Sequence, residues 1–160
     1  MGSLSELSLK DRVFLRGYRW RRIDPVPWSP LRKPLSECRV ALVSSAGLVA
    51  PRQARFDARM RGGDPSFREI PDGIAMGSLI DSHRSRSFDH EGIRRDPNLA
   101  LPIDRLHELA ASGRIGEPNR RHISFMGSLT ATGTFVRQTA PAAAELLVED
   151  GADVALLVPV

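Results

Sequence analysis

Continuous hydrophobic runs separated by polar, turn-rich segments organise this chain. RVALVS at residues 39–44 and VALLVPV at 154–160 have the length and apolar character of strands buried on both faces of a parallel sheet. HISFM at 122–126 predicts a third strand. The segment 101–116, LPIDRLHELAASGRIG, carries apolar residues at helical spacing and predicts a helix that Gly113 ends.

Weaker patterns complete the set of expected elements. Short strands are expected at 66–70 and 79–81, and a second helix at 140–150, APAAAELLVED. The stretch 82–98 is too polar for a core and predicts a long loop. Because strands and helices alternate, we expect an α/β fold with a mainly parallel sheet, flanking helices and a Rossmann-like arrangement.

The two ends of the chain differ from this middle part. PVPWSPLRKP holds four prolines in ten residues, so residues 1–36 are expected to form an extended N-terminal arm. Residues 37–160 then form the α/β domain. The sequence stops on a hydrophobic strand with no polar tail or following helix. We therefore expect the domain to be incomplete at its C-terminus and to continue beyond residue 160 in the full protein.

Composition narrows the class of protein. With 160 residues, 41% of them hydrophobic, the chain can build one sizeable core, and no run of ~18 apolar residues predicts a membrane span. Its one cysteine, Cys38, excludes an intramolecular disulfide and fits a buried, inert thiol better than a nucleophile. The net charge is +4, but the arginines are scattered, which disfavours nucleic-acid binding. We expect a cytoplasmic location.

Candidate chemistry gathers where the predicted strands end. In open parallel sheets, ligands bind beyond the carboxyl ends of the strands. Here those ends carry Ser45, Gly127, Ser128 and the terminal Val160. The stretch 127–134, GSLTATGT, has two interpretations that the sequence leaves open. It could hold an anion at a helix N-terminus, or it could be a polar connecting loop.

The polar stretch after residue 81 is the second candidate. His83 or His90 could act as general acid or base, with Asp89 orienting one of them. Asp96 and Asn98 could bind substrate. A structural loop network is an equally open interpretation, since such residues often make turn bonds. A metal on the histidines is the least favoured alternative, and we expect none.

Six stretches, taken in order, resemble one known family. They are VPWSPLRKPLSECRVALVSSAGL, GDPSFREIP, SHRSRSFD, DPNLALPIDRLHELAASGRIG, HISFMGS and APAAAELLVEDGADVALLVPV. Together they cover about residues 25–160 with short gaps. In these stretches the chain resembles the selenoprotein B family of glycine, sarcosine, betaine and D-proline reductases.

The resemblance implies an oxidoreductase that cleaves a C–N bond reductively, with a dithiol as electron donor. It implies a selenocysteine or cysteine just after the strand that matches ALLVPV, downstream of Val160. The chain would then be the N-terminal part of a longer protein and inactive alone. Expected partners are a pyruvoyl-containing subunit, the dithiol reductant, a small-molecule substrate and possible further copies of the chain.

The expected site follows from the resemblance and the sheet rule together. His83 would donate a proton to the departing amine or keep the downstream chalcogen ionised. The full set is catalytic His83 and Asp89, with Ser45, Asp96, Asn98, Gly127 and Ser128 binding substrate. The alternative function is a non-catalytic α/β binding module or partner subunit that lacks the redox residue.

Overall fold

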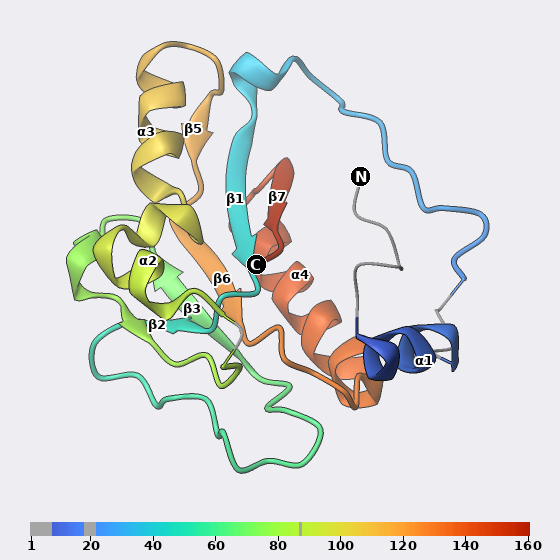
Figure 1. Ribbon diagram of the computed structural model, residues 1–160. Coiled ribbons are helices and arrows are strands. Elements are labelled where there is room, and N and C mark those ends of the chain that lie inside the picture. The colour runs from blue at the N-terminus through green and yellow to red at the C-terminus, as the bar shows by residue number, and fades with distance from the viewer. Residues whose placement is uncertain (1–7, 18–21, 87) are drawn as a thin grey trace. The chain divides into compact units, whose positions relative to one another are not determined.

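The computed structural model describes residues 8–17, 22–86 and 88–160 (Figure 1). The chain divides into two compact units, Met1–Pro30 and Leu31–Val160. The larger unit contains the sheet and every residue predicted for the site.

In the smaller unit, residues 9–17 form the helix α1 (Leu9–Gly17). The extended arm predicted for residues 1–36 is therefore wrong for this segment. Ser8 explains the helix: its Oγ accepts the Asp11 N–H at 3.2 Å, as an N-terminal cap does. Residues 22–34 contain no helix or strand, as their prolines predict. The predicted domain boundary after residue 36 stays a prediction.

A five-stranded, mainly parallel sheet forms the larger unit. Its central strand is β1 (Arg39–Ser44), with β7 (Val154–Val158) parallel on one side. On the other side, β5 (Glu117–Pro118) and β6 (Arg121–Phe125) lie parallel to β1, end to end. The edge strand β3 (Phe67–Pro71) is antiparallel to β6. The three main strands predicted from hydrophobic runs are confirmed.

Short elements were the hardest to predict. β5 has only two residues and lacks a hydrophobic run, so no sequence pattern predicts it. β2 (Leu48–Val49) was also not predicted. It pairs antiparallel with β4 (Ile80–Asp81), which confirms the short strand predicted at 79–81. Single 3-10 turns lie at η2 (Leu35–Glu37) and η3 (Met76–Ser78).

One face of the sheet is covered by α2 (His90–Arg95) and α3 (Ile103–Ala111), and Figure 1 shows these helices on the side opposite α4. Leu42 of β1 is fully buried there, in one cluster with Ile93 and Ile103. Because successive strand residues point to opposite faces, the neighbours of Leu42 face the other layer. The α/β class is thus confirmed, with helices on both faces.

The other face is covered by α4 (Ala140–Glu149), whose Leu147 packs against Ala41. A π-helical segment, η5 (Phe135–Thr139), runs directly into α4. Pro141 explains this wider turn, since it has no N–H to donate and its ring would clash with the preceding turn. The helix predicted at 140–150 therefore begins earlier than expected.

The polar stretch 82–98 is not one long loop, so that prediction is wrong. It contains α2 and the 3-10 turn η4 (Pro97–Leu99). The Asp89 carboxylate caps α2 by accepting the Gly92 N–H at 2.9 Å, and Ile93 supplies the one apolar anchor of α2. A single apolar residue in a short, charged helix leaves no periodic pattern to detect.

Candidate active site

The carboxyl ends of β1, β6 and β7 meet at one edge of the sheet, as predicted. The parallel pairing of β1 with both other strands brings this about. Ser45, directly after β1, contacts both neighbours. Its carbonyl accepts the Gly127 N–H at 2.8 Å, and its Oγ accepts the Val160 N–H at 2.9 Å. Three of the residues predicted for this edge therefore lie together.

Gly127 suits the close approach of these chain segments. A Cβ at this position would lie 3.0 Å from the Ser45 Cβ and 3.1 Å from the Ser45 carbonyl oxygen. A side chain here would require Ser45 or the exit of β6 to shift by a few tenths of an ångström. Gly127 thus serves the geometry of the edge, whatever binds there.

Ser128 is held by an arginine from the polar stretch. The Arg84 guanidinium donates to the Ser128 carbonyl at 2.8 Å and to the Met60 carbonyl at 2.9 Å. Arg84 Nε also lies 3.4 Å from the Ser128 hydroxyl. Arg84 therefore ties the loop after β6 to the segment around residue 60.

The rest of the GSLTATGT loop makes contacts of the same kind. The N–H groups of Thr130 and Ala131 both donate to the Gly62 carbonyl, at 2.8 and 3.1 Å. Two amides that an anion would need are therefore already paired within the protein. Of the two interpretations left open by the sequence, these contacts favour the polar connecting loop.

His83 lies beside the exit of β1. A Cβ on Gly47, two residues beyond Ser45, would come within 3.3 Å of the His83 backbone. The His83 ring stacks on Phe88 with centroids 4.2 Å apart, and its Nδ1 accepts the Ser85 N–H at 3.2 Å. Burial lowers the pKa of His83 below 6.5, and the nearby Asp81 charge only partly opposes this. At neutral pH the neutral imidazole is the major form.

Asp81, which the sequence did not single out, is the carboxylate that holds the histidines. Its Oδ2 lies 2.5 Å from His90 Nδ1, and its Oδ1 accepts the His83 backbone N–H at 3.0 Å. The hydrogen bond with Asp81, and then the one with the Ser85 carbonyl, raise the pKa of His90. The available signal was the Asp-x-His spacing at a strand end, since a carboxylate there reaches two residues on.

The Asp89 side chain caps α2, and the structure records no hydrogen bond or ion pair between it and either histidine ring among the described residues. Asp96 and Asn98 are also engaged in local bonds. Asp96 Oδ1 accepts the Asn98 N–H at 3.0 Å, and Asn98 Nδ2 donates to Asp104 at 2.8 Å, which joins η4 to the start of α3. These contacts match the structural interpretation of the polar stretch. The catalytic and substrate-binding roles predicted for the three residues stay predictions.

The opposite edge of the sheet carries a different set of polar residues. Cys38, just before β1, is fully buried, and its Sγ lies 3.3 Å from the Pro34 carbonyl. Asp150 is buried beside arginines from β6 and its preceding turn. Burial alone would raise the pKa of Asp150, but hydrogen bonds from Arg121, Arg120 and Asn119 outweigh it and lower the pKa to about 2. This edge contains structural ion pairs.

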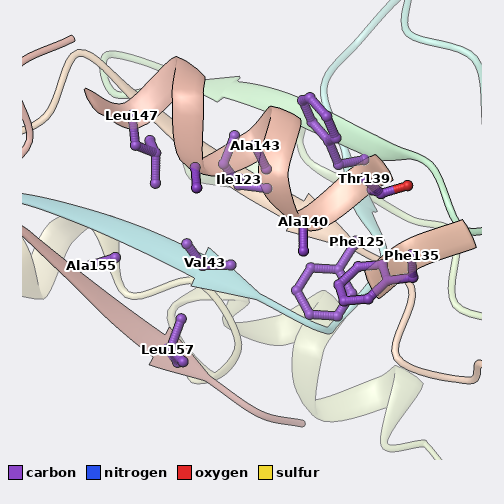
Figure 2. Close-up of a pocket in the computed structure, with 12 residues that line it drawn as sticks. Val43, Ile123, Phe125, Phe135, Thr139, Ala140, Ala143, Leu147, Ala155 and Leu157 are labelled. Atoms are coloured by element: carbon purple, nitrogen blue, oxygen red, sulfur yellow. The ribbon is translucent and has the colours of Figure 1, made fainter. Parts of the chain in front are cut away.

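An apolar cavity of about 320 Å³ lies between α4 and the sheet (Figure 2). Phe125 and Phe135 meet at one end of it, with ring centroids 4.8 Å apart. Figure 2 shows Leu157 of β7 and Ala143 of α4 on opposite sides of it. Its lining offers hydrocarbon atoms almost throughout, with Thr139 as the polar exception. The cavity suits packing or an apolar group, and it provides no acid, base or nucleophile.

None of the described helices is long and apolar enough to cross a membrane. Within the same residues, no group of three or more histidine, cysteine or acidic side chains is arranged to hold a metal ion.

Comparisons with known proteins give three similar relatives. D-proline reductase subunit gamma of Acetoanaerobium sticklandii is 35% identical over 136 residues, which cover 84% of this chain and 54% of the relative. Sarcosine reductase complex component B subunit beta of Peptoclostridium acidaminophilum is 28% identical, covering 93% and 34%. Glycine reductase complex component B subunit gamma of Carboxydothermus hydrogenoformans is 27% identical, covering 77% and 28%.

The chain thus spans about half the length of the first relative and about a third of the other two. No solved structure gives a significant match. A family model described as glycine/sarcosine/betaine reductase selenoprotein B matches residues 7–159, which is almost the whole chain. The chain therefore belongs to the glycine/sarcosine/betaine reductase selenoprotein B family.

Proposed function

We propose that this chain supplies the α/β part of a reductase that cleaves the C–N bond of a small amino acid. One observation carries the proposal within the family: Ser45 joins the exits of β6 and β7 at the carboxyl edge. In this sheet β6 and β7 flank β1 on opposite sides, which supports the proposed Rossmann-like arrangement. The gap between such strands is where open α/β sheets bind ligands.

The expected selenocysteine or cysteine would follow β7 in this gap. When present, it would supply the nucleophile and the two-electron redox chemistry, with a dithiol as the electron source. The residues of this chain fit that position. Ser45 Oγ holds the backbone N–H of Val160 and so fixes the direction in which the chain leaves β7. The hydrogen bond from the Gly127 N–H to the Ser45 carbonyl keeps Gly127 at the same edge.

His83 is the residue that we propose for proton transfer to the departing amine. It lies beside Gly47, at the same edge. Because burial lowers its pKa, the proton-donating form increases as the pH falls below neutrality. Ser45, Gly127 and Ser128 would border the substrate.

The relatives are subunits named for D-proline, sarcosine and glycine reductases, and two are named as components of complexes. On that basis we propose that this chain also acts on a small amino acid and binds a partner subunit. A pyruvoyl group on the partner, which would bind the substrate amine, belongs to the proposal. So does a cytoplasmic location, where thiols and selenols stay reduced.

The test is an alkylation assay on the reading frame continued past Val160. Reduced protein is treated with iodoacetamide near neutral pH, and mass spectrometry locates the label. A Cys38→Ser variant is the control, because it removes the only thiol of residues 1–160. We expect rapid labelling of a residue just after β7, unchanged in Cys38→Ser, and dithiol oxidation that requires one of the three amino acids.

The alternative is a non-catalytic binding module or partner subunit. The structural contacts of Asp89, Asp96 and Asn98 favour it, since they leave fewer groups for catalysis. If the continued reading frame has no selenocysteine or cysteine after β7, or labels only at Cys38, the reductase proposal is wrong and the binding module stands.

A further inference from the structure

A closed circuit of hydrogen bonds links the backbone of His83 to its own ring. The His83 N–H donates to Asp81 Oδ1 at 3.0 Å, and Asp81 Oδ2 lies 2.5 Å from His90 Nδ1. His90 Nε2 lies 2.8 Å from the Ser85 carbonyl oxygen. The Ser85 N–H then returns to His83 Nδ1 at 3.2 Å. Four residues thus determine one another's orientation.

The circuit assigns protons to both rings. His90 faces an acceptor at each nitrogen, a carboxylate and a carbonyl, so both nitrogens must carry hydrogen. His83 faces a donor at Nδ1, so its neutral ring carries hydrogen on Nε2. Within residues 22–86 and 88–160, no hydrogen bond reaches that Nε2.

We infer that Asp81 and His90 are positioning residues: His90 is a fixed imidazolium that closes the circuit, and the circuit presents His83 as a neutral Nε2–H donor. Phe88 supports the arrangement, since its ring stacks on His83 and meets His90 edge-on. When the surroundings of two neighbouring titratable groups hold them in different protonation states, the two groups can take different roles in acid–base chemistry.

The surrounding charges are consistent with this division. His83 is faced by Asp81, His90 and Arg84, and the two cations oppose its protonation. His90 is faced by Asp81 and by Arg94, whose Nε lies 3.7 Å from Asp81 Oδ2. The Asp81 carboxylate therefore lies between the His90 ring and the Arg94 guanidinium, and it lies closer to His90.

The inference deepens the proposed function. It rests on that function only where it names the ligand that His83 would bind. At neutral pH the neutral Nε2–H binds an acceptor, such as a carboxylate oxygen or a developing negative charge, while the protonated form that would supply a proton to the amine is the minor one and increases as the pH falls. The ligand that His83 would meet is therefore an anion or a polar acceptor of a substrate. The protonation states themselves are properties of this chain alone.

The experiment is nitrogen-15 NMR of the imidazole rings in the 160-residue chain across a pH titration. We expect His90 to show two protonated nitrogens at neutral pH, and His83 a single Nε2–H tautomer. Replacing Asp81 by Asn (Asp81→Asn) should increase the acid dissociation constant of His90 at least about threefold. It should also introduce a measurable Nδ1–H fraction at His83.

Asp89→Asn is the matched control, because Asp89 adjoins His90 in sequence but caps α2, a role that Asn also fills. It should leave both histidines nearly unchanged. The inference is overturned if wild-type His90 is neutral at pH 7, or if Asp89→Asn affects it as strongly as Asp81→Asn. The wild-type titration decides the protonation states even if Asp81→Asn fails to fold. Since no reductase activity is measured, this result is separate from the alkylation test.

Discussion

Each edge of the sheet carries an aspartate that bridges two histidines, yet the two clusters differ in kind. At the carboxyl edge, Asp81 holds His90 and the backbone of His83, and neither ring is fully buried. At the amino edge, Asp72 Oδ1 lies 3.0 Å from Nε2 of His122, whose side chain is completely buried in β6.

The two clusters differ in what the second nitrogen of the histidine ring contacts. His122 Nδ1 accepts the Leu42 backbone N–H at 3.1 Å, so the ring supports the pairing of two central strands. Burial lowers the pKa of His122, and the hydrogen bond with Asp72 does not offset it. His83 also accepts an N–H, but from a surface turn, and no described residue forms a hydrogen bond with its other nitrogen. Similar residue types thus build a core at one edge and a candidate site at the other.

Replacing the core histidine should produce the largest effect. His122→Ala removes a fully buried side chain and leaves the Leu42 N–H without its acceptor. We expect a loss of about 3 kcal/mol in the free energy of unfolding, from the cavity and the orphaned donor together. Urea denaturation measures it.

His107→Ala is the comparison for this loss, since His107 also contacts Asp72 but its side chain is half exposed. It should cost less than about 1 kcal/mol. Equal losses for the two variants would contradict the distinction between the core and surface partners of Asp72.

Replacing His83 should affect activity and leave the fold intact. In the reading frame continued past Val160, His83→Ala removes the proposed proton donor, and turnover should fall at least about tenfold. The free energy of unfolding should change by less than about 1 kcal/mol, because the ring is only partly buried and stacks on Phe88 at the surface. Steady-state kinetics and urea denaturation on the same preparation separate the two. Normal turnover would remove His83 from the mechanism.

The sequence predicted the parts of this molecule that depend on long, regular patterns. Continuous apolar runs identified β1, β6 and β7, and the rule for parallel sheets placed Ser45 and Gly127 at one edge. Gly113, expected to end a helix, has φ of +68°, and Gly151, which follows α4, has φ of +76°, the left-handed conformation that glycine favours.

The polar part of the site was predicted only by residue type. His83 and His90 were identified, and Asp89 was the carboxylate predicted to orient one of them. The actual partner, Asp81, reaches His90 only because α2 folds the chain back toward β4. That fold depends on a side-chain cap and one buried isoleucine, and such contacts cannot be read from hydrophobic periodicity.

Two glycines extend the comparison of the edges to the backbone. Gly127→Ala should cost about 1 kcal/mol, because its Cβ would lie 3.0 Å from the Ser45 Cβ at the carboxyl edge. Gly73→Ala at the amino edge is the control, since nothing lies within 4 Å of a Cβ there. It should be neutral or slightly stabilising. Thermal unfolding compares the two, and equal shifts would mean that the Ser45 contact yields easily.

The smallest expected effect is an opposite pH dependence at the two edges. The pKa of His122 is lowered in the folded state, so its contribution to stability is complete above its ordinary value of 6.5 and is lost as the pH falls below it. The pKa of His90 is raised, so its contribution is complete below 6.5 and is lost as the pH rises through the folded-state value.

Urea denaturation of wild type, His122→Gln and His90→Gln at several pH values between about 5.5 and 8 tests this. The stability difference between wild type and His122→Gln should shrink as the pH falls, and the difference for His90→Gln should grow. Slopes of the same sign in both comparisons would show that the two clusters do not differ in protonation, and the contrast between a core histidine and a fixed imidazolium would fail.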